Sequence, residues 1–531
     1  MKRAIMSCTR LESNIYTMPD LFKYADENWP GDWEGRALLG QICLYKYTHR
    51  SPRHLKAALD ELPKHLNKDG YFGKIAGDHS VNEQQMAGNS WFLRAMCEYY
   101  EWTNDPTALQ TIKNITYNLL IPSKEFYRSY PLNRRAEQGK AMGKLLHTPK
   151  DGWYLSTDTG CAFIMLDGAA HAYKILKDQV LGETLKVMIE KLSTADYVGL
   201  EFQTHAILSA TRGILRYYEV AKDSSSLAFA EKIFDTYLQS AITENYANYN
   251  WFRKPEWTEP CAYIDSYIVA MELFRFTKKV RYLETAHKIY YNAIGFGQRA
   301  NGGFGVDVCS GVKDAFLRGK SDDLYEAYWC CSMRGGEGLS KAILYQYLVG
   351  EDNSLYVSGY NSNTIQFRTN HGCLMMRQST RYPEEGYSLF EILKADTEKV
   401  CLHFFIPSYV NLDTLKILIQ GKEVLQKPVV QNGFLELEIN PNIIKKIEIY
   451  FDIPLICEET AKDHLAGKKY SHGFVLLGAL NASIPLNTVK KLTSVGLAMY
   501  QTEKSELLVP VYQILNFPKD QFLKSHMQIV F

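Results

Sequence analysis

Two short segments of the sequence combine side chains that can hold a metal ion. In WTEPCAY, Glu259 and Cys261 are separated by one residue, and in YWCCSM, Cys330 and Cys331 are adjacent. Adjacent cysteines do not easily form a disulfide with each other. One carboxylate and three thiolates are suitable ligands for a four-coordinate zinc ion, which would also keep the thiols deprotonated at neutral pH. The residues alone leave two interpretations open, a zinc site or structural cysteines.

Composition limits the classes of partner. The chain has 531 residues, with 60 basic and 59 acidic side chains and a net charge of +1. It has no long run of one sign that would indicate binding to nucleic acid or to a membrane surface. We therefore expect small molecules or neutral polymers as partners, and a homodimer stays open.

The redox state and location follow from two further patterns. Eleven cysteines, an odd number without the spacing of a disulfide framework, predict mostly reduced thiols. The N-terminus has no apolar segment of a secretory signal, and no stretch is apolar enough to span a membrane. A cytoplasmic location is expected, with a removed signal as the open alternative.

The elements that must position these cysteines are helical up to about residue 350. Apolar-periodic segments begin near residues 43, 95, 170, 213, 270 and 339, and five of them lead through a short polar turn into a second periodic segment. Such self-similarity is typical of stacked helical hairpins. The irregular spacing and long inserts such as 122–160 favour a closed ring with functional loops over an open solenoid.

After about residue 353 the pattern changes to short β-rich runs such as VCLHFFIP and KIEIYFDI, separated by polar turns. This spacing indicates a β-sandwich. The predicted fold class is therefore a two-domain α+β protein, with a helical ring over 1–350 and a β-sandwich over 351–531.

The segment TEPCAYIDSYIVAMELFRFTKKVRYLETAHKIYYNAI, followed by NGGF and YWCCSMRGGEGLSKAILYQYL, resembles the catalytic region of glycoside hydrolase family 127, the β-L-arabinofuranosidases. DGYF at 69, GNSWFL at 88, QTHAIL at 203 and RYPEEGY at 381 resemble the family as well. The resemblance implies an (α/α)6 barrel followed by a β-sandwich, in agreement with the six periodic segments and the five hairpins that they begin.

The family resemblance also implies a mechanism and a cofactor. It implies a retaining hydrolase that releases terminal β-L-arabinofuranose from plant-type glycans, with a zinc-bound cysteine as nucleophile. Carried over to this chain, the nucleophile is Cys330, and Glu259, Cys261 and Cys331 complete the Zn²⁺ shell. A thiolate is a far better nucleophile than a thiol, which is the chemical reason for such an arrangement.

Retention requires a second group that protonates the leaving oxygen and then deprotonates water. In the family this is a glutamate about 16 residues before the Glu-x-Cys glutamate, in a Gly-Glu-Ala-Phe context. Here Glu244 lies 15 residues before Glu259 in the different context TENYANYNWF, and it is the predicted acid/base. Glu256, Glu326 and Glu337 remain alternatives.

Three further residues are candidates for sugar binding. His205 in QTHAIL matches a family histidine that lines the sugar pocket, and Trp251 and Trp329 flank the motifs and offer aromatic faces. The competing interpretation for each is a packed core residue.

The chain departs from the family in two places. Ser332 and Met333 stand where the family commonly has Pro-Pro, and Pro260 stands between Glu259 and Cys261 where it has Thr. These changes leave the metal ligands in place and put the sugar specificity in question. Three alternatives stay open: a glycosidase for another five-carbon sugar, a non-catalytic carbohydrate-binding protein with a structural zinc, and an epimerase or lyase in which the cysteines are incidental.

Overall fold

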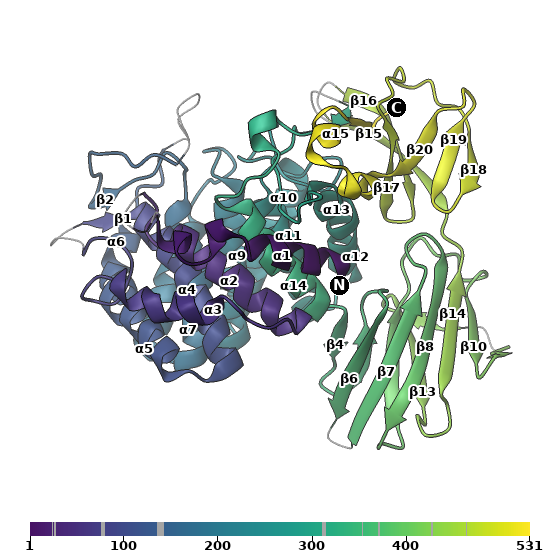
Figure 1. The fold of residues 1–531 in the computed structure, drawn as a ribbon, viewed down its shortest axis with the longest axis horizontal. Coiled ribbons are helices and arrows are strands. Elements are labelled where there is room, and N and C mark those ends of the chain that lie inside the picture. Colours follow the sequence, from purple (N-terminus) through teal and green to yellow (C-terminus); the bar gives the residue numbers. More distant parts are fainter. Residues whose placement is uncertain are drawn as a thin grey trace.

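The protein has a helical part followed by two β-sheet parts (Figure 1). The computed structural model describes residues 1–531 except 24, 26–27, 76–79, 135–142, 311–314, 353, 370–371, 426–427 and 463–464. The helices lie together on one side, and the two β parts lie one above the other on the opposite side in this view. The predicted fold class, a helical ring followed by β structure, is confirmed.

Six inner helices form a closed ring, because each packs against the next and α14 packs against α2. An outer helix packs against each of them, and α1, from the start of the chain, is the outer partner of α14. The inner helices are α2 (Asp32–Thr48), α4 (Glu83–Thr103), α7 (Met165–Leu176), α9 (Thr204–Ala221), α11 (Pro260–Thr277) and α14 (Cys331–Leu344). The outer helices are α3 (Leu55–Glu61), α5 (Pro106–Asn114), α8 (Gln179–Ser193), α10 (Ser224–Ser240), α12 (Val280–Lys288) and α1 (Lys2–Leu11).

The turns of the hairpins share one local design. Five inner helices end at a residue whose backbone is left-handed, with φ between 51° and 59°, and whose N–H bonds back into the last turn. In three hairpins the next residue is an aspartate, Asp105, Asp178 or Asp223, whose side chain caps the outer helix. The polar turns seen in the sequence are therefore helix stop and start signals. The five left-handed residues are His49, Asn104, Lys177, Lys222 and Lys278.

The first β part is a sandwich of two sheets that enclose one apolar core. Its five-stranded sheet begins with β4, which directly follows the last inner helix. The order in this sheet is β12 (Val430–Gln431), β13 (Phe434–Ile439), β9 (Val400–Phe405), β5 (Leu355–Val357) and β4 (Tyr347–Val349). The six-stranded sheet has β11 (Lys422–Glu423), β10 (Lys416–Ile419), β14 (Lys446–Phe451), β8 (Gly386–Ala395), β7 (Gly372–Thr380) and β6 (Asn363–Thr369).

The second β part is a separate sheet with its own apolar clusters. It joins the helical part directly, because β3 (Phe316–Leu317) pairs with β21 (Met527–Gln528) at its edge. The C-terminal region therefore contains a sandwich and a further sheet, where the sequence predicted one sandwich over 351–531. The domain boundary between 350 and 351 stays a prediction. Its other strands are β15 (Leu455–Lys462), β16 (Leu465–His472), β17 (Val475–Leu480), β20 (Leu507–Pro510), β19 (Met499–Thr502) and β18 (Leu492–Gly496). Shorter elements are α6 (Lys124–Arg128), α13 (Gly295–Gly297), α15 (Lys519–Leu523), β1 (Val81–Asn82) and β2 (Trp153–Tyr154).

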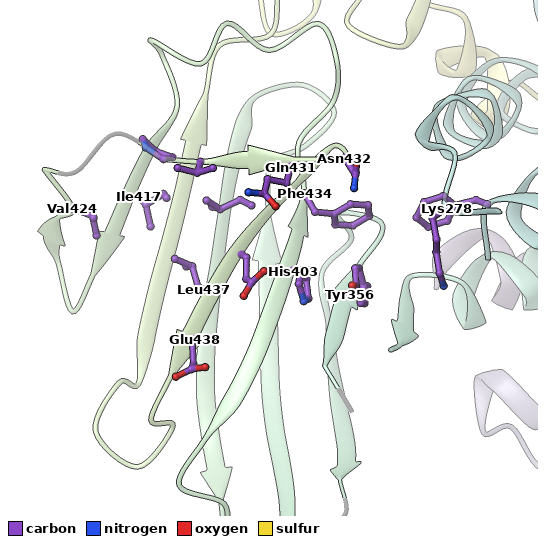
Figure 2. A pocket seen from close by; sticks show the side chains of 15 residues that line it. Lys278, Tyr356, His403, Ile417, Val424, Gln431, Asn432, Phe434, Leu437 and Glu438 are labelled. Carbon is purple, nitrogen blue, oxygen red and sulfur yellow. Dashed lines mark ion pairs between the residues drawn. The ribbon is translucent and has the colours of Figure 1, made fainter. Parts of the chain in front are cut away.

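A groove of about 580 Å³ lies where the five-stranded sheet meets the end of α11 (Figure 2). Phe274 of α11 stacks on Phe434 of β13 at a ring distance of 5.8 Å and closes one end of the groove. Lys278, His403 and Tyr356 are among the side chains that line it.

No helix among the described residues combines the length and the apolar character needed to cross a bilayer. The cytoplasmic location and the homodimer remain predictions from the sequence.

Candidate active site

The four predicted metal ligands lie at the starts of two neighbouring inner helices. Glu259 is the N-cap residue of α11 and Cys330 is the N-cap residue of α14, so Cys261 and Cys331 fall in the first turns. Because α11 and α14 are adjacent in the ring, the two starts lie side by side. One ligand atom from each of the four residues lies within 4.8 Å of the others.

The sulfur distances suit a shared metal ion. The Sγ atoms of Cys261 and Cys331 are 3.6 Å apart, and those of Cys330 and Cys331 are 3.3 Å apart. A disulfide needs about 2.05 Å, and all cysteines of the chain are free. Two sulfurs bound to one tetrahedral zinc ion lie about 3.8 Å apart, because each Zn–S distance is about 2.3 Å. The four side chains therefore form a group that can hold a zinc-like cation.

The charge balance of the group also fits a cation. Burial and the neighbouring Cys261 raise the pKa of Glu259 well above its usual range, and burial raises the pKa of Cys261 to about 12. The pKa of Cys331 is raised for the same reason. The positive group that contacts these sulfurs is Arg36, whose Nη1 lies 3.6 Å from the Sγ of Cys261. A divalent cation would supply the charge that allows all four ligands to ionise.

Cys330 differs from the other three ligands in exposure and acidity. Glu259 is 7% exposed, Cys331 1% and Cys261 0%, whereas Cys330 is half-buried. Hydrogen bonds from the thiols of Cys261 and Cys331 lower the pKa of Cys330. Its position at the N-terminus of α14 also favours a thiolate. Cys330 is therefore both the least buried of the four ligands and the one that ionises most easily.

An aromatic and cationic stack supports the group from the interior. Arg36 is held by two hydrogen bonds of 2.7 and 2.9 Å to the carboxylate of Asp32. The guanidinium groups of Arg36 and Arg334 lie 4.3 and 4.4 Å from the ring centre of Trp91. The ring of His205 stacks on the same indole at 5.6 Å. These contacts fix the orientation of Arg36 toward Cys261.

His205 links the metal-ligand group to the interior. Its Nδ1 lies 3.5 Å from Oε1 of Glu259, and its Nε2 lies 3.4 Å from Oδ2 of Asp265. Gln203 reaches the other oxygen of Glu259 at 3.5 Å. His205 is 2% exposed, so these contacts make it a residue that positions Glu259. Its predicted contact with a sugar hydroxyl stays a prediction.

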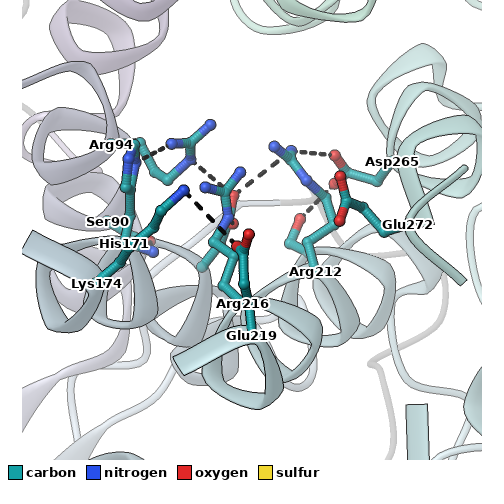
Figure 3. Close-up of polar contacts among 12 residues, drawn as sticks. Ser90, Arg94, His171, Lys174, Arg212, Arg216, Glu219, Asp265 and Glu272 are labelled. Atoms are coloured by element: carbon teal, nitrogen blue, oxygen red, sulfur yellow. Dashed lines mark hydrogen bonds and ion pairs between the residues drawn. The ribbon is translucent and has the colours of Figure 1, made fainter. Parts of the chain in front are cut away.

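A network of buried ion pairs lies deeper along the inner helices (Figure 3). Arg212 contacts Asp265 at 2.6 Å and Glu337 at 2.5 Å, and Arg94 contacts Glu337 at 2.9 Å and Asp167 at 3.2 Å. The five residues come from α4, α7, α9, α11 and α14 and are at most 2% exposed. The network therefore joins five helices of the ring and holds Asp265 beneath His205.

Removing one member of this network should destabilise the ring strongly. Glu337→Ala removes the carboxylate that three buried arginines, Arg94, Arg212 and Arg334, all contact, at an expected cost of about 3–5 kcal/mol in free energy of unfolding. The matched control is Asp60→Ala, which breaks the exposed Lys56–Asp60 pair of 2.6 Å and should cost less than about 1 kcal/mol. Urea denaturation followed by circular dichroism measures both, and equal midpoints would contradict the role of the network.

Glu244, the predicted acid/base, lies on the loop before α11 and is 3% exposed. Its carboxylate forms an ion pair with Lys469 and accepts a 2.5 Å hydrogen bond from the hydroxyl of Thr460, both from the last sheet. The same loop touches the metal-ligand group, because Oδ1 of Asn248 accepts the backbone N–H of Glu259 at 3.2 Å. Glu244 is thus an ion-paired carboxylate on a loop that borders the group.

The three alternative glutamates have other surroundings. Glu337 belongs to the buried network described above. Glu326 pairs with Arg10 at 2.8 Å and accepts a 2.7 Å hydrogen bond from Ser332, one of the residues that replace the Pro-Pro of the family. Glu256 is exposed. Both Glu337 and Glu326 therefore have structural partners.

Asp158 is a buried carboxyl that no sequence motif marks as functional. It is 7% exposed, and burial raises its pKa to about 6, although a backbone N–H of Gly143 donates to it. Its charge also raises the pKa of Glu259, so the two carboxyls interact. Asp158 lies in the insert 122–160, which the irregular hairpin spacing had marked as functional. Like Glu259, Asp158 is thus a buried acid whose pKa is raised.

The two predicted tryptophans differ in exposure. Trp329 directly precedes Cys330, is 41% exposed, and packs edge-on against Tyr328 at 5.2 Å. Trp251 packs edge-on against Trp257 at 5.6 Å, and its buried Nε1 has no hydrogen-bond partner within the described part of the chain. An unpaired indole N–H and an exposed ring are both suited to a sugar. Sugar binding by these residues stays a prediction.

Comparisons with known proteins agree with this geometry. Residues 42–342 match the family model of the β-L-arabinofuranosidase GH127 catalytic domain, and residues 354–453 match that of the GH127 middle domain. The fold is similar to the GH127 β-arabinofuranosidase BT3674, with a TM-score of 0.69, 13% identity, and coverage of 99% of this chain and 91% of that chain. It is also similar to Ara127N-Se, a GH127 β-L-arabinofuranosidase from Geobacillus stearothermophilus T6, with a TM-score of 0.68, 13% identity, and coverage of 99% and 93%. No curated protein matches the chain.

The match to the catalytic-domain model spans more than half of the chain, and the middle-domain match follows it in the order of the sequence. The ring of helical hairpins, the sandwich behind it and the group of four ligands at the starts of α11 and α14 agree with the resemblance seen in the motifs. The chain therefore belongs to glycoside hydrolase family 127 and is a glycoside hydrolase.

Proposed function

We propose that the enzyme is a retaining β-L-arabinofuranosidase that uses Cys330 as its nucleophile, with Zn²⁺ held by Glu259, Cys261, Cys330 and Cys331. The observation that carries this proposal is the unequal exposure of the four ligands. Three are buried, whereas Cys330 is only partly buried and has a lowered pKa. When bound, zinc would keep the four ligands ionised and the sulfur of Cys330 a thiolate at neutral pH.

The reaction then proceeds in two displacements. In the first, the Sγ of Cys330 attacks the anomeric carbon, the bond to the leaving oxygen breaks, and an acid gives that oxygen a proton. In the second, the same group, now a base, takes a proton from water, whose oxygen attacks the anomeric carbon as the C–S bond breaks. Two inversions leave the configuration of the sugar unchanged.

Glu244 and Asp158 are the two candidates for the acid. Glu244 has the predicted position in the sequence, but the ion pair with Lys469 favours its charged form, and an acid must hold a proton before the first step. Asp158 holds a proton more readily, since its pKa is about 6. Glu244 could serve only if substrate binding displaces Lys469. Glu244 remains a candidate for the acid because of the family resemblance, and Asp158 is a candidate because its burial favours the protonated form.

One set of assays tests the reaction and the sugar together. The purified protein is offered aryl and alkyl furanosides and pyranosides of five-carbon sugars, and we expect hydrolysis of the β-L-arabinofuranosides with retention, read by NMR. A preference for another sugar would assign it to a related glycosidase. Binding without any release of sugar would identify a carbohydrate-binding protein.

The acid is identified by the leaving-group dependence of two variants, Glu244→Gln and Asp158→Asn. Loss of the true acid should slow hydrolysis of an alkyl furanoside by about 10²- to 10⁴-fold, and that of a nitrophenyl furanoside far less, because a good leaving group needs no proton. Loss of a merely structural carboxylate should affect both substrates equally. If each variant lost activity equally on the alkyl and the nitrophenyl furanoside, neither Glu244 nor Asp158 would be the acid.

A further inference from the structure

Three metal-binding side chains lie together on the outer face of the five-stranded sheet, apart from the group at α11 and α14. Cys401 and His403 are two residues apart on β9, so they point to the same face. Glu436 on the neighbouring strand β13 lies directly opposite His403. One ligand atom from each of the three lies within 4.8 Å of the others.

Within this group the imidazole of His403 lies between the thiol of Cys401 and the carboxylate of Glu436. The Sγ of Cys401 lies 3.4 Å from Nε2 of His403, and Nδ1 of His403 lies 4.0 Å from Oε2 of Glu436. The His403 side chain is 11% exposed and that of Glu436 is 64% exposed. The group therefore has a partly buried sulfur and nitrogen and an oxygen ligand that is free to turn toward an ion.

The neighbouring strand on the other side holds the imidazole in place. Tyr356 of β5 is the register partner of His403, and its ring stacks on the imidazole at 4.1 Å with an angle of 4°. Such stacking restricts the rotation of the imidazole, so little conformational entropy remains to be lost on binding an ion.

The groove of Figure 2 reaches two of the three side chains, His403 and Glu436, and gives an ion access to them from solvent. His403, Glu436 and Glu438 line it, and Lys278 stands at its far side. Glu438 pairs with Lys399 at 2.6 Å, so its charge is already matched. Glu436 has no such lysine or arginine among the ion pairs of the described residues.

We propose that Cys401, His403 and Glu436 form a second metal site that binds a divalent transition ion, foremost Zn²⁺. One sulfur, one nitrogen and one oxygen suit zinc, whereas Ca²⁺ and Mg²⁺ require oxygen ligands only. Three protein ligands leave one position of a tetrahedral ion open toward the groove, where water or a small ligand can bind. Because Cys401 would bind as a thiolate, its proton passes to solvent when the ion enters.

A third group with suitable residue types does not meet the same conditions. Glu98, Glu101 and His171 also lie close together. Arg94 and Lys341, however, contact Glu98 at 3.4 and 2.9 Å, and Arg94 also contacts the imidazole of His171. With Lys46 at 3.3 Å, three cationic side chains already surround Glu98, which opposes a metal ion there. By contrast, no ion pair with lysine or arginine is found for Glu436 within the described ranges.

The test is the number of zinc ions per chain in full-length variants. The reduced protein is equilibrated with Zn²⁺, passed over a weak chelating resin, and analysed for zinc and protein. We expect two ions in the wild type, one in Cys401→Ala, His403→Ala and Glu436→Gln, and two in the matched control Cys457→Ala, which removes an exposed cysteine of the neighbouring sheet. Glu436→Gln changes an exposed side chain and should fold even if the other two do not.

The outcomes separate this site from the proposed catalytic zinc. Hydrolysis should stay within about twofold of the wild type in the three variants, because none of them touches the catalytic group. If the wild type binds one ion and Cys401→Ala binds none, the second site stands and the catalytic zinc is refuted. Equal zinc content in the wild type and all three variants would overturn the second site, whatever the activity.

Discussion

Cys330→Ala should abolish hydrolysis while the protein remains folded. The thiolate of Cys330 is the atom proposed to bond to the sugar, and losing a nucleophile of this kind lowers kcat by roughly 10⁴- to 10⁶-fold. Cys330 is half-buried at the start of α14, so alanine should leave little cavity and little change in stability. Initial rates on an aryl β-L-arabinofuranoside, together with thermal melting, measure both effects.

Cys457→Ala is the matched control for this experiment, because it also removes a free cysteine, but an exposed one on β15. Its activity should equal that of the wild type. If Cys330→Ala retained more than about a tenth of wild-type activity, Cys330 would not be the nucleophile.

Removal of the metal should have the second large effect. Without a cation, the pKa of Cys261 is about 12 and those of Glu259 and Cys331 are raised, so these three ligands are protonated at neutral pH and no metal bond fixes the direction of the Cys330 sulfur. Dialysis against a chelator with a reductant should lower activity by at least about 100-fold. Added Zn²⁺ should restore it, and Mg²⁺ should not.

The same raised pKa values set the sign of the pH dependence. Zinc must displace protons from thiols that hold them tightly, so its affinity for the group should fall as the pH falls. Titration of Zn²⁺ into the weakly buffered apoprotein should release protons, which an indicator dye detects. Full activity of a chelated protein that holds no zinc, or binding without proton release, would contradict this assignment.

The ring and the ligand group were predictable because their signals are local. Each hairpin has a periodic helix, a polar turn and often an aspartate such as Asp105 that starts the next helix, all within a short stretch. The pairing of Glu259 and Cys261 with Cys330 and Cys331 rested on the family resemblance. The ring gives it a physical basis, since neighbouring inner helices bring their starts together.

The surroundings of the group could not be predicted in the same way. Trp91, Arg36 and Asp265 act through contacts between helices distant in sequence, and their residue types are common in cores and surfaces alike. The ion pair of Glu244 with Lys469 depends on how the last sheet packs on the ring, which no local pattern encodes. Asp158 looks like an ordinary loop aspartate until its burial is known.

The most direct test of the central claim is the identity of the residue that becomes bonded to the sugar. The enzyme is mixed with an activated aryl β-L-arabinofuranoside, quenched with acid during turnover, digested and analysed by peptide mass spectrometry. Of Glu244→Gln and Asp158→Asn, the variant that lacks the acid/base should release the sugar from the enzyme more slowly. Its use should therefore increase the yield of the sugar-bound peptide. We expect one pentosyl residue on the sulfur of Cys330 and no adduct in Cys330→Ala. A pentosyl group on any other side chain, or its persistence in Cys330→Ala, would contradict the mechanism.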